Sequence, residues 1–250
     1  MDIRIEEVLP SLRLRHIHAL FAENSADACQ KVIGLMPPDA VVGIGDSTTA
    51  RQLVLQQALK KKGIRVLDPF EPDGPEKTPE ERLHQMRTIH KEATVCDVVL
   101  TGTNAVTQDG RLVNVDAVGN RIAGIFWGHP LSIVVVGRNK IVKDLDEAFY
   151  RIRNVIAPNH LRIRSVELGG RESKTPCAVT GECSDCRSTD RICNIFAVIE
   201  GKPFFTDLNV ILVDEDLGLG WDPAWPKDRI ETIIANYKKF VWVPPRNGRR

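Results

Sequence analysis

The chain has 250 residues, and its 34 Lys and Arg stand against 33 Asp and Glu, which gives a formal net charge of +1. This balance excludes a broad nucleic-acid-binding face, which needs clustered excess cations. Hydrophobic residues make up 42% and charged residues 27%, which excludes disordered, collagen-like and coiled-coil chains. No apolar run approaches the ~18 residues of a membrane span, and the polar, acidic start is no secretory signal. We therefore expect a cytoplasmic protein with no membrane span, folded as a single domain over residues 1–250.

Apolar spacing and capping residues predict the elements in chain order. Residues 1–38 form a helical N-terminal part, because apolar residues recur at helical spacing from Glu6 to Glu23 and from Ala26 to Leu35. The next elements are a strand at 40–45, a helix from Ser47 that Gly63 stops, a strand at 64–67 and a loop at 68–77. They are followed by a helix from the capping box at Thr78 to about Ala93, a strand at 97–101, a hairpin turn at 108–111, a strand at 131–137 and a helix from Asp144 to Pro158. The last elements are strands at 196–199 and 210–213, a helix through Ile230 and Tyr237, and a flexible basic tail at 244–250.

Strands alternate with helices from residue 40 to residue 157. This alternation predicts an α/β fold with a mainly parallel sheet flanked by helices. A four-cysteine segment at 174–195 is appended to it.

Four of the six cysteines fall within seventeen residues, in the pattern Cys-x5-Cys-x2-Cys-x6-Cys. Four thiolates are the usual ligands of a structural zinc ion or a [4Fe–4S] cluster. Zinc ribbons usually carry two Cys-x2-Cys knuckles and this segment has one, which favours the iron–sulfur cluster. Zinc, or reduced thiols that bind nothing, are the alternatives. The predicted metal ligands are Cys177, Cys183, Cys186 and Cys193.

A polar turn follows the strand at 40–45 and opens a helix. Its Gly45, Asp46, Ser47, Thr48 and Thr49 offer amides and hydroxyls that suit a phosphate or a carboxylate. The turn matches neither the dinucleotide fingerprint nor a Walker loop. A capped helix with no ligand is the alternative interpretation.

Further polar residues follow the next strands, and open parallel sheets bind ligands at strand ends. Arg121 and Lys140 are candidate charge partners for a small anion. Turn and surface roles are the alternatives. His16 with His18, and His84 with His90, have spacings that do not suit a shared metal. The remaining candidates of this group are Thr103, Asn104, Asn114, Asp116, Asn120 and Asn139.

These motifs, in this order, resemble the lactate-utilisation (LUD) domain family, the group of LutC-like proteins. The resemblance covers roughly residues 20 to 220. It rests on the runs GIGDSTT at 43–49, LTGTNAVT at 100–107, VNVD at 113–116, GNR at 119–121, VGRNKIV at 136–142 and APN at 157–159, and on the cysteine segment. Thr103 departs from the Ala that we expect in the family, so the ligand pocket of this chain differs from those of its relatives.

The resemblance implies a fold similar to that of ribose-5-phosphate isomerase, glucosamine-6-phosphate deaminase and the CoA transferases (NagB/RpiA/CoA-transferase-like). In that group the turn matched by Ser47, Thr48 and Thr49 holds a phosphate or an acyl group. The acidic and lysine residues that those isomerases use for proton transfer have no convincing match here.

The resemblance also implies a role in oxidising lactate or a related 2-hydroxy acid. The chain would be an iron–sulfur-binding electron-transfer or accessory subunit, working beside iron–sulfur or flavin dehydrogenase subunits. Two alternatives remain open: a structural-zinc assembly protein, or a sugar-phosphate or acyl-CoA-binding enzyme. A homo-oligomer is a further possibility.

Overall fold

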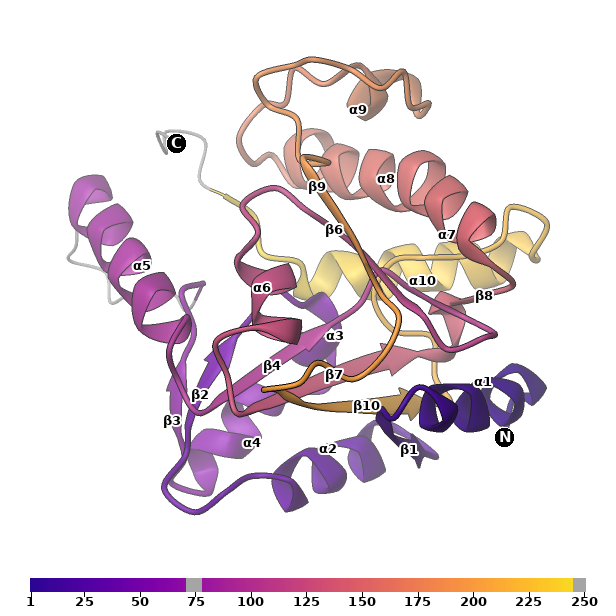
Figure 1. The fold of residues 1–250 in the computed structure, drawn as a ribbon. Coiled ribbons are helices and arrows are strands. Elements are labelled where there is room, and N and C mark those ends of the chain that lie inside the picture. Colours follow the sequence, from indigo (N-terminus) through magenta and orange to yellow (C-terminus); the bar gives the residue numbers. More distant parts are fainter. Residues whose placement is uncertain (71–77, 245–250) are drawn as a thin grey trace.

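The computed structural model describes residues 1–70 and 78–244, and their strands form two sheets (Figure 1). All neighbouring strands of the larger, six-stranded sheet are parallel, in the order β1-β10-β7-β4-β2-β3. Its strands are β1 (His18–Ala22), β2 (Val41–Ile44), β3 (Arg65–Leu67), β4 (Val98–Gly102), β7 (Leu131–Gly137) and β10 (Asp207–Val213).

The smaller sheet has the order β8-β5-β6-β9 and is mainly antiparallel. The turn predicted at 108–111 is confirmed, because β5 and β6 form an antiparallel hairpin around it. The sequence reasoning did not predict a second sheet. Its strands are β5 (Ala105–Thr107), β6 (Leu112–Asp116), β8 (Ile141–Val142) and β9 (Ile195–Ile199).

Side chains that cap free backbone N–H groups fix where several helices begin. Thr78 and Glu81 form the predicted capping box, and the Asp144 carboxylate accepts a hydrogen bond from Glu147 N at 2.9 Å. The helices are α1 (Ile3–Leu14), α2 (Ser25–Gly34), α3 (Thr48–Gln52), α4 (Leu55–Lys61), α5 (Pro79–Ala93), α6 (Asn120–Phe126), a 3-10 turn (Arg138–Lys140), α7 (Leu145–Arg151), a π-helical turn (Ile152–Ile156), α8 (Ala157–Arg162), a second π-helical turn (Ile163–Glu167), α9 (Pro176–Thr180) and α10 (Lys227–Phe240).

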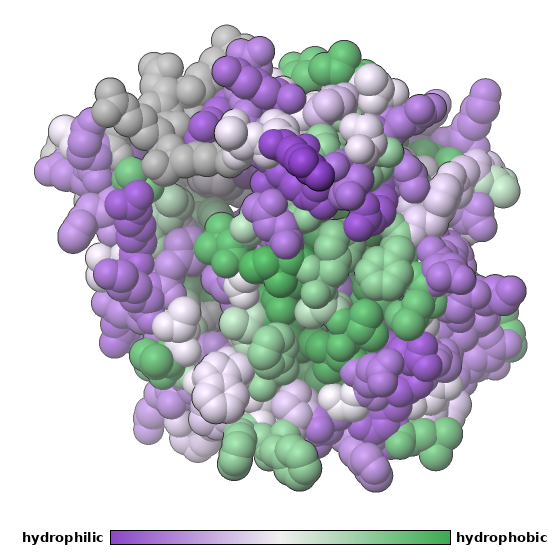
Figure 2. Space-filling model, turned by 45° about the horizontal axis from the view of Figure 1, so that its top comes forward, coloured by the Kyte–Doolittle hydropathy of each residue, from purple (hydrophilic) through white to green (hydrophobic). Residues whose placement is uncertain are grey.

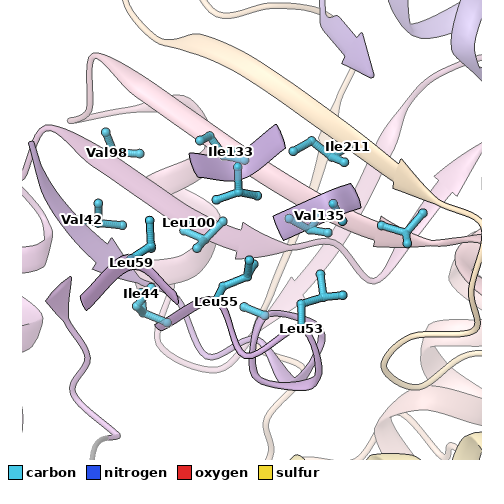
Figure 3. Close-up of a cluster of buried hydrophobic side chains, with 14 of the residues drawn as sticks. Val42, Ile44, Leu53, Leu55, Leu59, Val98, Leu100, Ile133, Val135 and Ile211 are labelled. Carbon is cyan, nitrogen blue, oxygen red and sulfur yellow. The ribbon is translucent and has the colours of Figure 1, made fainter. Parts of the chain in front are cut away.

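The alternation of side chains along β7 separates two hydrophobic cores, because successive residues of a strand point to opposite faces. Ile133 and Val135 belong to the core beneath α2, α3 and α4 (Figure 3). Val134 and Val136 belong to a second core, which the small sheet and α1 cover. A third core lies between the small sheet and the helices α7 and α10. The fold is therefore layered as helices, large sheet, small sheet and helices (Figure 1).

The predicted α/β class with a mainly parallel sheet is confirmed. Three expectations about helices were wrong. The helix expected from Ser47 to Gly63 is divided into α3 and α4 at Val54, whose φ is +54°. Pro158 does not end the helix from Asp144, because α8 continues to Arg162. The helix from Glu6 to Glu23 stops at Leu14, and β1 takes its last part. His16 adopts a left-handed conformation (φ 61°), and Ile17 N bonds to Leu12 O at 3.1 Å, which closes the helix. Glycine usually marks such a stop, so a histidine in this role left no signal in the sequence.

The predicted loop and the predicted flexible tail fall largely outside the described residues. The parts that fall outside are residues 71–77 of the loop at 68–77 and residues 245–250 of the basic tail. Pro244 is described, and its carbonyl accepts a hydrogen bond from Arg171 N at 3.1 Å. Across the described ranges, no helix combines the length and the hydrophobicity that a membrane crossing requires.

Candidate functional site

The polar turn at 45–49 lies where the order of the large sheet reverses. From β2 the chain crosses to β3 on one side and then returns to β4 on the other. Ligands of open α/β sheets bind at such a switch point, outside the carboxyl ends of the strands. Gly45 N bonds to Leu100 O at 3.1 Å, which ties the turn to β4. We call the surroundings of this turn the crevice.

Position 45 of the turn is a glycine because no larger residue fits there. A Cβ atom at this position would lie 2.6 Å from Thr101 Oγ1 and 3.1 Å from Arg121 Cγ. Real Cβ contacts are almost never that short. The glycine therefore lets the backbone of β2 approach β4 and the arginine of α6.

The rest of the turn is held by side-chain contacts. Asp46 pairs with Arg51 at 2.9 Å, and Ser47 Oγ accepts a hydrogen bond from Ala50 N at 3.2 Å. Burial would raise the pKa of Asp46, but Arg51 and Arg164 hold it below its usual value. The helix that the turn opens, α3, has only five residues. Its dipole is therefore small, and anion binding here must depend mainly on side chains.

Lys140 reaches the same turn from the end of β7. Its side chain is buried, and its Nζ donates a hydrogen bond to Thr49 Oγ1 at 3.0 Å. Burial, with a smaller contribution from Arg121, lowers the pKa of Lys140 to about 7. The side chain that the sequence suggested as a fixed cation therefore exchanges its proton near neutral pH.

Arg121 is the second predicted charge partner, and its neighbours hold it in place. Its Nη2 donates to Asn104 Oδ1 at 3.1 Å and to the carbonyl of Val115. Its Nε lies 4.0 Å from an Asp116 carboxylate oxygen, which also accepts a hydrogen bond from Ile122 N at 3.2 Å. Asn104 and Asp116 thus position the arginine and the start of α6.

Thr103 and Asn139 make hydrogen bonds within the fold. The hydroxyl of Thr103 donates to the carbonyls of Ala105 and Val113 at 3.1 and 3.2 Å. Buried Asn139 donates to Gly220 O at 2.9 Å and accepts from Leu217 N at 2.8 Å. These contacts use the polar atoms that a ligand would otherwise bind.

Asn120 and Asn114 differ in their surroundings. Asn120 Nδ2 lies 3.5 Å from His90 Nδ1, at the side of the crevice nearest α5. Asn114 is fully buried in β6, and neither polar atom of its amide has a hydrogen-bond partner among the described residues.

Sequence reasoning missed a buried network on α8, the turn after it and α10. His160 Nδ1 lies 2.5 Å from the Tyr237 hydroxyl, and Arg164 Nη1 donates to His160 Nε2 at 2.7 Å. Burial and the nearby Arg164 lower the pKa of His160 to about 3, so the ring is neutral. Burial raises the pKa of Tyr237 to about 12, and its hydroxyl bonds to Thr48 of the turn. The spacing of four between His160 and Arg164 was the only signal in the sequence, and it is common in helices.

The four clustered cysteines line one small cavity, together with Arg153, Asp185 and Arg191. The cysteine segment packs beside α8 through α9, and it has no regular structure from Gly181 to Asn194. The cavity is distinct from the crevice. The predicted clustering in sequence is therefore also a clustering in space.

Arg191 folds the cysteine segment back on itself. It donates to Cys186 O at 2.6 Å and to Cys193 O at 2.9 Å, and it pairs with Asp185 at 2.8 Å. Arg153 reaches the same Asp185 carboxylate at 3.3 Å. These contacts bring backbone from both ends of the segment to one guanidinium group.

In this cavity the pKa values of two cysteine thiols are raised, because the thiols are buried and lie close to one another. Burial and the neighbouring cysteines raise the pKa of Cys193 to about 11 and also raise that of Cys177. In the described residues, no three His, Cys, Asp or Glu side chains are placed so that they could hold a metal ion. The four thiols match the donor chemistry of a metal site, but they must move closer together to bind one.

Comparison with known proteins gives the family. The LUD domain matches residues 5–213, from α1 to the end of β10, which includes the cysteine segment. No curated protein matches the chain. Among solved structures, a DUF162 family protein from Deinococcus radiodurans is similar, at 15% sequence identity and a TM-score of 0.45, over 84% of this chain and 96% of that one. The chain belongs to the LUD domain family, which supports a role related to lactate utilisation.

Proposed function

We propose that the chain binds an iron–sulfur cluster and works as an electron-transfer or accessory subunit in the oxidation of lactate or a related 2-hydroxy acid. The observation that carries this proposal is that all four clustered cysteines line a single cavity. Family membership supports the metabolic role.

The donor set fits a cluster of the [4Fe–4S] type, which four cysteine thiolates hold. Cys177 would bind from α9, Cys183 and Cys186 from the irregular segment, and Cys193 from the residues before β9. A bound cluster supplies one-electron transfer. The absence of regular structure at 181–194 leaves the segment free to draw the thiols together.

The residues around the cavity would position the ligands and moderate their charge. Arg191 holds the backbone of Cys186 and Cys193, and Arg153 braces the same loop through Asp185. Two guanidinium groups beside four thiolates reduce the repulsion between them. Each arginine is therefore a positioning residue in this proposal.

Electron transfer needs a partner, which we propose is an iron–sulfur or flavin dehydrogenase subunit. Apolar side chains gather at the centre of the face seen in Figure 2. Near the cysteine segment, Val118, Val179 and Ile195 are exposed. Exposed apolar surface of this kind favours contact with another protein.

We further propose that the crevice binds a small anion. Lys140 and Arg121 converge there with Ser47 and Thr49, and Arg51 is next to the turn. Because the pKa of Lys140 is about 7, an anion would bind with uptake of a proton at and above neutral pH. A carboxylate such as lactate fits this chemistry.

Metal content tests the cluster. The full chain, purified without oxygen, should contain iron and acid-labile sulfide and should absorb visible light. A colourless protein with stoichiometric zinc would contradict the electron-transfer role and favour a structural-zinc assembly protein.

Cysteine substitutions locate the cluster. Cys183→Ser, Cys186→Ser and Cys193→Ser should each lose the iron and the visible absorbance. Cys29→Ser is the matched control, because Cys29 is partly buried in α2 and belongs to another core. Equal iron in Cys29→Ser and Cys193→Ser would place the metal elsewhere.

A thermal-shift screen with candidate ligands tests whether the crevice binds a small anion. Lactate and pyruvate should raise the melting temperature of the wild-type chain more than that of Lys140→Met. A shift with sugar phosphates or acyl-CoA alone would favour an enzyme of the isomerase-like fold. Equal shifts in both proteins would remove Lys140 from the binding site.

A further inference from the structure

A second hollow lies away from both the crevice and the cysteine cavity. It measures about 410 Å³, within the range of small-molecule sites. Its walls come from α1, β8, α7 and the start of α10, and it shares no lining residue with the cysteine cavity. We call it the Trp225 pocket, after the indole at its wall.

Three guanidinium groups surround that indole. The Cζ atoms of Arg4, Arg151 and Arg229 lie 5.2, 5.6 and 3.7 Å from the ring centroid of Trp225. They come from three different helices, far apart in the sequence. The exposed Lys143 adds a fourth cation to the lining. Two acidic side chains, Glu147 and Asp222, complete the charged groups that line the pocket.

Each guanidinium is oriented by a carboxylate but retains donors. Arg4 uses Nε and Nη2 on Asp2, and Arg229 uses Nε and Nη2 on Asp216. Arginine carries five N–H donors, so donors remain on each after these pairs. The carboxylates therefore fix the direction of the groups without exhausting them.

Arg151 is the most buried of the three guanidinium groups. Its side chain is 4% exposed, and its Nε has no hydrogen-bond partner among the described residues. Burial lowers its pKa, although Glu147 opposes the change. Its Nη1 donates to Asn139 O and its Nη2 to Glu147, so the fold fixes this cation at the wall of the pocket.

We propose that the Trp225 pocket binds a small organic phosphate. A phosphate group carries about −1.5 to −2 charges and three acceptor oxygens, which suits several cations converging from separate elements. A carboxylate has two oxygens and a single charge, which one arginine already satisfies. Ile141, Val142 and Trp225 give an apolar wall for the organic part.

Calorimetric titration of the full chain with inorganic diphosphate tests the phosphate part. Diphosphate should bind, and acetate at the same concentration should not. Arg4→Gln and Lys143→Gln should each weaken binding by about tenfold. The matched control, Arg65→Gln, removes an exposed cation on β3, at the far edge of the large sheet. No binding of diphosphate, or an equal loss in the control, would overturn the proposal.

Tryptophan fluorescence tests whether diphosphate binds beside Trp225. Diphosphate should change the emission of the wild type and of Trp127→Phe, whose indole is exposed elsewhere, but not that of Trp225→Phe. A response that persists in Trp225→Phe would place the anion at another site. Cys193→Ser should bind diphosphate as the wild type does, because this inference does not depend on the cluster.

Two larger ligands test whether the pocket also contacts the organic part of an organic phosphate. Adenosine diphosphate and glucose 6-phosphate should be compared with diphosphate in the same titration. Tighter binding of either supports an organic phosphate and identifies a nucleotide or a sugar as the remainder. If neither binds more tightly than diphosphate, the apolar wall makes no contribution and the organic part of the proposal is wrong.

Discussion

Lys140 and Thr49 meet across the crevice, with the lysine Nζ 3.0 Å from the threonine hydroxyl. Lys140 lies in the 3-10 turn that follows β7, and Thr49 lies in the first turn of α3, after β2. The contact places a buried amine beside the only turn that the sequence singled out as anion-binding.

Lys140 makes stability depend on pH. Its pKa falls from 10.5 in the unfolded chain to about 7 in the folded one. Between these values the unfolded state holds a proton that the folded state lacks, so the contribution of Lys140 to stability rises with pH and is constant below about 7. Lys140→Met should remove this slope and increase stability at pH 7 by on the order of a few kcal/mol.

Urea unfolding between about pH 6.5 and about pH 9.5, which covers most of that window, measures the effect as a difference between the two proteins. The difference matters because burial also raises the pKa of Cys177 and Cys193, which lowers stability at alkaline pH in both. Lys143→Met, an exposed neighbour, is the control. The same slope in Lys140→Met as in the wild type would contradict the assignment.

Gly218 should not tolerate a side chain. Its φ is +70°, and a Cβ atom would lie 2.8 Å from Lys140 Nζ. Gly218→Ala should therefore cost more than Gly63→Ala, where φ is +79° but the space is open. We expect about 1 kcal/mol for the backbone strain alone, and more at Gly218. In a Lys140→Ala background the excess should fall, and the part that remains should come from Thr49 Oγ1, which would lie 2.9 Å from the same Cβ. An unchanged excess would show that Lys140 does not cause it.

Asn139 should be among the costliest asparagines to replace. It is fully buried and bonds to two backbone groups of the loop after β10. Asn139→Ala leaves both groups buried and unpaired, which should cost about 2 kcal/mol or more. Asn154→Ala is the control, because Asn154 makes one exposed hydrogen bond. Equal losses of unfolding free energy in the two variants would refute this role.

Asn114 should behave in the opposite way. Its buried amide makes no hydrogen bond within the described residues, so Asn114→Leu removes an unsatisfied polar group from an apolar layer. We expect the free energy of unfolding to rise by about 1 kcal/mol. A loss of stability in Asn114→Leu would mean that the amide does have a partner, and the search for a bound molecule would begin there.

The elements of the fold that could be predicted are those whose sequence signals lie in neighbouring residues. The capping box at Thr78 and the turn at 108–111 were correct, because their signals lie within four residues. The end of α1 at His16 was missed, because a non-glycine residue in left-handed geometry has no sequence mark. The second sheet was missed because β9 joins β6 from about 80 residues further along the chain.

The same distinction applies to the candidate site. Ser47, Thr49 and Lys140 stand next to strand ends, where position in the sheet predicts a ligand. His160, Arg164 and Tyr237 are placed by the packing of α8 and α10 against the turn, which no local pattern reveals. Thr103 and Asn139 were predicted as ligand-binding residues from their polar type, and the hydrogen bonds that the structure shows for them are made within the fold.

The pairing of β1 with β10 constrains the order of folding during synthesis. Within the part of the chain that the structure describes, His18–Ala22 pair in this sheet only with Asn209–Val213. A growing chain therefore carries an unpaired N-terminal strand until nearly all of it has left the ribosome. The core at α1 cannot close before β10 has been made. Any truncation before residue 207 should leave β1 unpaired in this sheet and prone to aggregation.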